Sequence, residues 1–148
     1  MHPQSWRPKV VPLFAFIIAT ASSFANGTEF FSWLAVRYPD QSVKTFLQGH
    51  FASKPRCEQL NQSTWDNVLT ACGSCKVDEQ FCSPISNLRD GYAKALRKER
   101  AAFPYVVATP NGRIIISGVP THNAVAECHR LADRFKENGY EDARCILP

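Results

Sequence analysis

Six cysteines constrain this 148-residue chain more than any other feature of its sequence. They are Cys57, Cys72, Cys75, Cys82, Cys128 and Cys145. An even number of cysteines in an exported chain favours complete pairing, and each disulfide would stabilise the fold by about 2–4 kcal/mol. We therefore expect three disulfides and no free thiol. The number of cysteines alone does not select the partners.

The N-terminus indicates export. The first nine residues have two basic and no acidic side chains, residues 10–21 form an uncharged apolar run, and small residues precede a cleavage point after Ala25. This order is typical of a secretory signal peptide at residues 1–25. An uncleaved anchor is the alternative, although the run is short for a bilayer span and Pro12 interrupts it. We expect a periplasmic or secreted protein with no stable membrane span after cleavage.

Net charge argues against nucleic-acid binding. Two of the 17 Lys and Arg residues lie in the expected signal peptide. The remaining 15, set against 13 Asp and Glu residues, give a net charge of about +2. That excess is too small for a phosphate-binding surface. The hydrophobic fraction of 45% is ordinary for a globular domain.

The C-terminal third has the clearest local signals. Residues 104–109 and 113–119 are rich in β-forming side chains, and Pro110-Asn111-Gly112 between them predicts a hairpin, with Gly112 in a left-handed conformation. Thr121 opens an amphipathic helix that ends at Asn138-Gly139, and residues 143–147 alternate as a final strand. The helix should pack on one face of an antiparallel sheet. Cys128 on its apolar stripe then faces the last strand, so we expect a Cys128–Cys145 disulfide.

The preceding part is less regular. Residues 29–38 have apolar side chains at helical spacing and Pro39 follows, so we expect a helical N-terminal extension over residues 26–41. Residues 40–48 fit either a short helix or a strand running to Phe51. Ser53 should cap a helix that continues to Ala71. A Cys-rich insertion is expected at about 70–101, with a bridged loop at 72–86 and an exposed, basic-ended helix at 87–101.

Cys72-Gly-Ser-Cys75 is a C-x-x-C motif with several interpretations. A thiol–disulfide active site is one, because such motifs work when the first thiol is a thiolate at neutral pH. A zinc site with Cys82 and a histidine is another, but no second metal-ligand pair completes it. A single C-x-x-C in a Cys-rich exported chain is more often structural. His50, His122 and His129 are isolated in the sequence, and we expect neither a metal nor a cofactor.

The C-terminal third resembles the second half of a SPOR (sporulation-related repeat) domain over residues 103–147. The matching positions are Gly112-Arg113, Ile114-Ile115-Ile116, Gly118, Thr121, Ala124, Leu131, Gly139-Tyr140 and Asp142-Ala143. In the first half, residues 46–53 resemble the family's first strand. Cys57-x-x-Leu60 and Cys128-x-x-Leu131 also suggest a degenerate two-fold repeat. The resemblance implies an α+β, ferredoxin-like or SPOR-like domain over residues 42–148, with helices on one face of an antiparallel sheet. It also implies that the other face binds peptidoglycan glycan strands.

A weaker resemblance is to thioredoxin-like domains. In those domains a cis-proline precedes such a hairpin and faces the C-x-x-C motif, and Pro104 holds that position here. The spacing between Cys75 and Pro104 is tight for that fold, which also needs no strand after its last helix.

Strand alternation identifies a candidate binding face. A three-residue turn would place Thr109 opposite Arg113, Val107 opposite Ile115 and Tyr105 opposite Ser117. The expected free face consists of Tyr105, Val107, Arg113, Ile115, Ser117 and Arg144. The opposite set is Val106, Ala108, Ile114 and Ile116, which should lie under the helices. Alternatively, N-terminal helices at 29–48 cover the first face, and it binds nothing.

These patterns favour an exported, disulfide-bonded, non-catalytic binding domain of the bacterial cell envelope. Its partner would be peptidoglycan glycan strands or another envelope protein. One alternative is a periplasmic thiol–disulfide oxidoreductase using Cys72-Gly-Ser-Cys75. Another is a secreted inhibitor or immunity-type protein whose loop at 72–86 enters a partner's active site.

Overall fold

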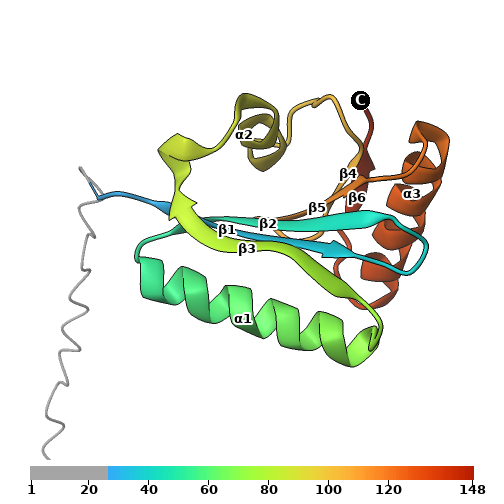
Figure 1. Ribbon diagram of the computed structural model, residues 1–148. Coiled ribbons are helices and arrows are strands. Elements are labelled where there is room, and N and C mark those ends of the chain that lie inside the picture. Colours follow the sequence, from blue (N-terminus) through green and yellow to red (C-terminus); the bar gives the residue numbers. More distant parts are fainter. Residues whose placement is uncertain (1–26) are drawn as a thin grey trace, which may run out of the picture.

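The computed structural model describes residues 27–148, which form a six-stranded antiparallel sheet with helices on both faces (Figure 1). The expected signal peptide at 1–25 lies outside the described residues. The elements are β1 (Phe30–Arg37), β2 (Val43–Phe51), α1 (Lys54–Ala71), β3 (Lys76–Pro84), a 3-10 turn η1 (Ile85–Asn87), α2 (Asp90–Leu96), β4 (Tyr105–Val107), β5 (Gly112–Ser117), α3 (Thr121–Glu137) and β6 (Arg144–Ile146). The strand order is β3-β1-β2-β5-β4-β6. The α+β class with an antiparallel sheet is therefore confirmed.

The chain folds as two units of the same topology. In each unit a hairpin leads into a helix, and the following strand pairs with the first strand of the hairpin. The first unit is β1-β2-α1-β3 and the second is β4-β5-α3-β6, and they join where β2 pairs with β5. Each unit also has a disulfide from its helix to its last strand, Cys57–Cys82 and Cys128–Cys145. The expected Cys128–Cys145 pair is thus present, in one of two equivalent positions.

The expected helical extension over 26–41 is wrong, because Phe30–Arg37 forms strand β1, which lies inside the sheet between β3 and β2. Its residues from Phe31 to Val36 are all buried. A strand covered on both faces has apolar residues without alternation, and such a run also satisfies helical spacing. Of the two alternatives for residues 40–48, a short helix or a strand, the structure has the strand: β2 runs from Val43 to Phe51.

The Cys-rich segment is not an insertion. Residues 76–84 form edge strand β3, which pairs along the whole of β1, whereas we expected a bridged loop at 72–86. Most of the residues of β3 are exposed, so this strand lacks the alternation of apolar and polar residues that indicates a strand in a sequence. The helix expected over 87–101 is shorter, with α2 covering only Asp90–Leu96.

The C-terminal hairpin, helix and final strand form as expected, but in a different register. Val107 pairs with Arg113 and Tyr105 with Ile115, a shift of two residues from the prediction. The N–H of Gly112 donates to the carbonyl of Thr109 at 3.3 Å and closes a four-residue turn. Gly112 does not have the expected positive φ. A side chain there would instead lie 2.6 Å from the Thr109 hydroxyl oxygen.

Two packing layers cover the sheet. On the α1/α3 face, Leu34 and Val36 pack under α1 while Ile114 and Ile116 pack under α3. On the opposite face, called the α2 face here, η1, α2 and the segment to Phe103 pack on β1, β2, β4 and β5. The expectation of helices on one face only is therefore wrong for α2.

Candidate functional site

The six residues expected to form a binding face share one face of the sheet. A register shift of two residues leaves the alternation of side chains unchanged, which explains this result. Their exposure is nevertheless not what we expected. Tyr105, Val107, Arg113 and Ile115 are buried, with at most 4% of any of them exposed, and only Ser117 and Arg144 are exposed. The prediction of a free face is wrong for the four buried residues.

Residue Arg113 explains how that face is closed. Its guanidinium donates hydrogen bonds of 2.8–3.2 Å to the carbonyl oxygens of Ala95, Leu96, Thr109, Pro110 and Gly112. Two of these carbonyls end α2, where the helix dipole is negative, and the other three belong to the hairpin turn. Burial lowers the pKa of Arg113, yet an arginine side chain stays protonated in a protein. The side chain expected to contact a ligand instead joins α2 to the β4–β5 hairpin.

A continuous series of aromatic rings crosses the α2 face from β4 to the edge strand β3. Tyr105 contacts Phe103 edge-on, Phe103 stacks on Tyr92, Tyr92 contacts Trp33 edge-on, and Trp33 stacks on Phe81, with centroid separations of 4.7–6.5 Å. The first ring is fully buried, whereas Phe81 is 43% exposed. The aromatic surface therefore opens to solvent at the β1–β3 end of the sheet.

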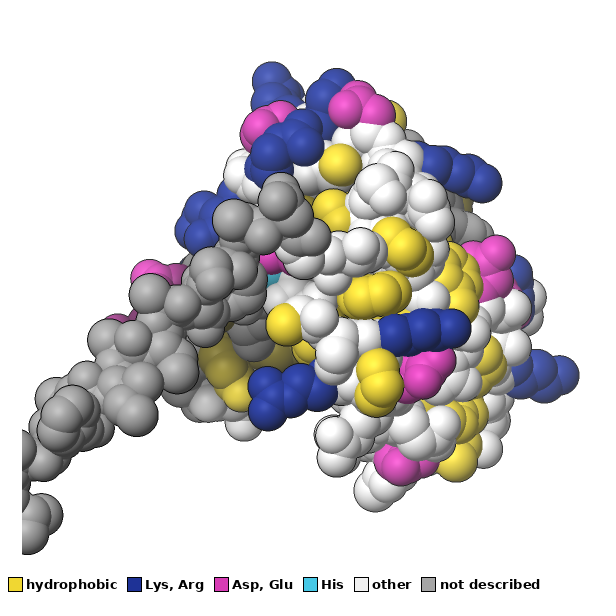
Figure 2. Space-filling model, turned by 90° about the vertical axis from the view of Figure 1, so that its left-hand side faces the viewer, with side chains coloured by type: hydrophobic (Ala, Val, Ile, Leu, Met, Phe, Trp, Pro, Cys, Tyr) yellow, Lys and Arg dark blue, Asp and Glu magenta, His cyan; other side chains and the backbone are white. Residues whose placement is uncertain are grey.

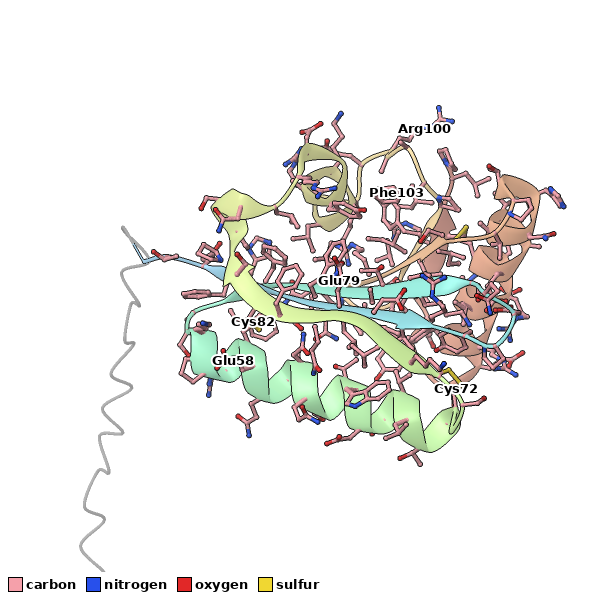
Figure 3. All side chains as sticks on the ribbon, viewed as in Figure 1. Glu58, Cys72, Glu79, Cys82, Arg100 and Phe103 are labelled. Atoms are coloured by element: carbon pink, nitrogen blue, oxygen red, sulfur yellow. A yellow bond between two sulfur atoms is a disulfide. The ribbon has the colours of Figure 1, made fainter. Side chains whose placement is uncertain are left out.

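A pocket of about 300 Å³ lies at this open end, between the sheet and the segment from η1 to α2. We call it the aromatic pocket; it is lined by Phe31, Trp33, Glu79, Phe81, Ser83, Asn87, Leu88, Arg89 and Tyr92. Figure 2 shows hydrophobic side chains exposed on the side of the molecule that has η1 and the end of β3, with acidic and basic side chains beside them. In Figure 3, Glu79 and Phe103 lie on the α2 side of the sheet, while Cys82 lies towards α1.

Polar groups in the aromatic pocket have defined positions. The indole N–H of Trp33 donates to Glu79 at 2.9 Å, which fixes the carboxylate beside the stacked rings. The Asn87 amide donates to the Ser83 hydroxyl at 3.0 Å. Arg89 is exposed and has no acidic partner within residues 27–148. The pocket therefore offers an aromatic face together with a carboxylate, an amide, a hydroxyl and a guanidinium.

The sequence interpretation missed this pocket because it depends on β1 and β3 being strands. The sequence pattern predicts a helix at Phe31 and Trp33 and a loop at Glu79 and Phe81. The available signal was the spacing of two between members of each pair, which places both side chains on one face of a strand. That spacing also occurs by chance in any sequence rich in aromatic residues, and it identifies a site only once the two strands are known to pair.

The C-x-x-C motif lies at the C-terminal end of α1, and not at a helix N-terminus. Cys72 and Cys75 form a disulfide there, where Cys72 donates its N–H to the carbonyl of Val68 at 2.8 Å. A helix N-terminus lowers the pKa of a thiol, whereas the negative C-terminal end has the opposite effect. Cys82 is bonded to Cys57, so all three cysteines considered as zinc ligands are in disulfides. The peptide bond before Pro104 is trans.

Within residues 27–148, no group of three or more His, Cys, Asp or Glu side chains is arranged to hold a metal ion. None of the helices described has the length and apolar character needed to cross a bilayer. No family model, curated protein or solved structure matches this chain.

Proposed function

We propose that this chain is an exported, disulfide-bonded, non-catalytic domain that binds a glycan strand through the aromatic pocket. The observation that supports this function is the exposed ring of Phe81, which stacks on Trp33 beside the fixed carboxylate of Glu79. The C–H face of a sugar ring packs on an aromatic face, and its hydroxyl and amide groups hydrogen-bond to polar side chains at the rim. A pocket of about 300 Å³ suits one sugar ring of a longer strand.

The charged groups fit an amino sugar in particular. Glu79 can accept hydrogen bonds from hydroxyl and acetamido N–H groups beyond the one that Trp33 donates. Arg89 can donate to acetamido carbonyl or carboxylate oxygens on the other side of the pocket. Peptidoglycan glycan strands offer all of these groups, and they are the ligand that the SPOR resemblance implies.

The proposed site lies on the sheet face that the resemblance implies, but further along the sheet, over β1 and β3. α2 and Arg113 close the face over β4 and β5, whereas the β1–β3 end stays open. The disulfide between Cys57 and Cys82 joins α1 to β3 directly behind the aromatic pocket. The ligand would therefore meet a stiff surface that loses little conformational entropy on binding.

The test is retention by peptidoglycan glycan strands freed of their stem peptides. The Phe81→Ala variant should lose at least tenfold in affinity because it removes the exposed stacking surface. Tyr140→Ala is the matched control, since Tyr140 is also an exposed aromatic residue, 48% accessible, and lies at the end of α3. Equal retention of the two variants, or no retention of the parent protein, would refute glycan binding at this pocket. Unchanged thermal unfolding of both variants would exclude loss of fold as the cause.

A further inference from the structure

We infer that the groove between α1 and α3 binds a short extended peptide whose C-terminal carboxylate lies against Lys44, Arg130 and Arg134. This groove is on the opposite face of the sheet from the aromatic pocket, and the inference does not depend on glycan binding.

The floor of the groove is the junction between the two repeat units. On the α1/α3 face, Lys44 pairs with Ile116, Phe46 with Ile114, and Gln48 with Gly112. Two cavities of about 410 and 600 Å³ lie along this floor. They share the lining residues Tyr38, Phe46, Ala71, Ile114 and Phe135. The groove is therefore continuous, with an apolar middle and walls from both helices.

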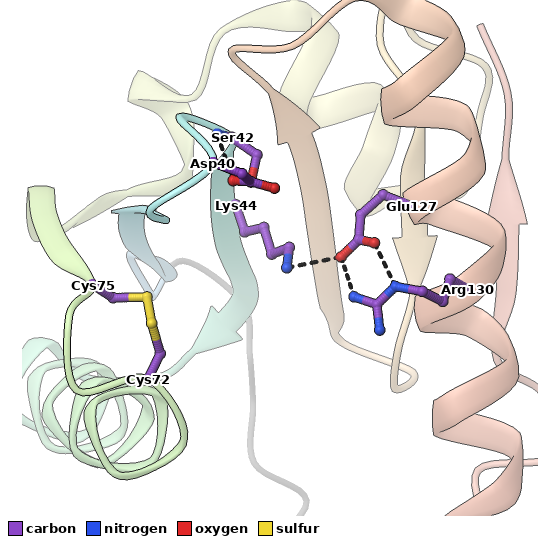
Figure 4. Close-up of polar contacts among 7 residues, drawn as sticks. All are labelled: Asp40, Ser42, Lys44, Cys72, Cys75, Glu127 and Arg130. Carbon is purple, nitrogen blue, oxygen red and sulfur yellow. Dashed lines mark hydrogen bonds and ion pairs between the residues drawn. A yellow bond between two sulfur atoms is a disulfide. The ribbon is translucent and has the colours of Figure 1, made fainter.

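One end of the groove has an excess of positive charge. Lys44 and Arg130 share the carboxylate of Glu127, at 2.8 Å from the Lys44 Nζ and 2.6 Å from the Arg130 Nε (Figure 4). Burial would raise the pKa of Glu127, but the hydrogen bonds from Arg130 and Lys44 hold it below its ordinary value, so Glu127 is anionic. Arg134 lines the same cavity and has no ion pair within the part of the chain described.

The only other acid lining this cavity is Asp40. Its carboxylate accepts hydrogen bonds from the backbone N–H and the hydroxyl of Ser42 and is not paired with a cation in the described chain. Three cations therefore face two carboxylates, which leaves one positive charge. Lys44 also lies 3.9 Å from the centre of the Tyr38 ring, so its position is fixed on two sides. One ligand carboxylate would neutralise this end.

The other end of the groove has a hydrogen-bond acceptor without a donor. The side-chain oxygen of Gln48 is buried and unpartnered, and Thr64 and Asn67 of α1 line the same cavity. A buried acceptor that lacks a donor is costly, and a rotation of the Gln48 amide towards the cavity would let a ligand N–H remove that cost. Lys44 and Gln48 are four residues apart on one strand, about 13 Å, which equals the rise of about four residues of extended peptide.

These polar walls favour a peptide over an alkyl chain with an anionic end. An alkyl chain would cover Gln48, Thr64 and Asn67 without providing hydrogen bonds, at a desolvation cost. A peptide backbone provides N–H and carbonyl groups along its length, while small apolar side chains can pack on Phe46 and Ile114.

The test uses a pool of N-acetyl tetrapeptides built from Ala, Val, Leu and Phe, in free-acid and C-terminal amide forms. Decanoate serves as the alkyl carboxylate. Titration of the oxidised full chain, followed by amide chemical shifts in β2, β5 and α3, should show the free acids binding at least tenfold more tightly than the amides. Equal binding of acids and amides, tighter binding of decanoate, or no binding of either pool would overturn the inference.

Variants separate the charged end from the rest of the molecule. Lys44→Met and Arg134→Ala should each weaken binding of the free acids at least fivefold. Lys136→Met, on the exposed part of α3, is the control and should change nothing. Since Lys44 is 8% exposed and its replacement can disturb folding, exposed Arg134 provides the variant that decides in that case. Phe81→Ala should leave peptide binding intact, so failure of glycan binding and failure of this inference are distinguishable.

Discussion

Replacing Arg113 by methionine should strongly destabilise the protein, because its guanidinium joins α2 to the β4–β5 hairpin. Methionine keeps most of the aliphatic stem and removes the guanidinium, so the packing of the stem changes little. What is lost is the set of hydrogen bonds to five carbonyl oxygens, each 2.8–3.2 Å from a guanidinium nitrogen.

The magnitude depends on how many of those carbonyls water can reach. The carbonyls of Thr109 and Gly112 would keep backbone donors, the N–H groups of Gly112 at 3.3 Å and Ala108 at 3.1 Å, and solvent can reach that of exposed Pro110. The carbonyl of Ala95 would keep the backbone N–H of Lys98 at 3.0 Å, whereas that of buried Leu96 would be left without a donor, at a cost of about 1–3 kcal/mol. Together with the loss of the charged hydrogen bonds to the other carbonyls, we expect a fall of roughly 2–4 kcal/mol in the free energy of unfolding.

Urea unfolding of the oxidised protein, followed by circular dichroism, measures this loss. Arg144→Met is the matched control, because Arg144 is exposed on the same sheet face and should change stability by less than about 0.5 kcal/mol. Hydrogen exchange should also speed up in α2 before it does in β5, since Arg113 anchors the C-terminal end of α2. A loss below about 1 kcal/mol, or unchanged exchange in α2, would show that Arg113 does not hold this segment.

Two further predictions concern the disulfides and pH. Replacing Cys57 and Cys82 by serine should cost about 3.5 kcal/mol, but replacing Cys72 and Cys75 only about 1.7 kcal/mol, because the chain-entropy contribution grows with loop length. Urea unfolding compares the two variants, and equal losses would contradict this explanation. Because the pKa of Glu127 is lowered by folding, its contribution is present above its unfolded pKa and is lost as pH falls through the folded value. Glu127→Gln should therefore flatten the acid side of the stability–pH profile, and an unchanged slope would argue against an anionic Glu127.

Local signals in the sequence determined the second repeat unit. The Pro110-Asn111-Gly112 turn, the helical stripe and the alternating final strand all depend on residues within a few positions of one another. The pairing of Cys128 with Cys145 followed from the same signals. Even the error in hairpin register left the faces correct, because side chains alternate with a period of two and the shift was two residues.

Tertiary structure alone decided which surfaces are open. The spacing of Phe31 and Trp33 fits a helix, and only the pairing of β1 with β2 and β3 makes this segment a strand. The same pairing places Phe81 beside its aromatic neighbours. Whether the face containing Tyr105 is free depends on α2, which Arg113 binds through backbone carbonyls. Any residue type supplies such a carbonyl, so no sequence pattern marks the contact. Exposure is set by contacts between distant segments, whereas turns and alternation are set by neighbours in the chain.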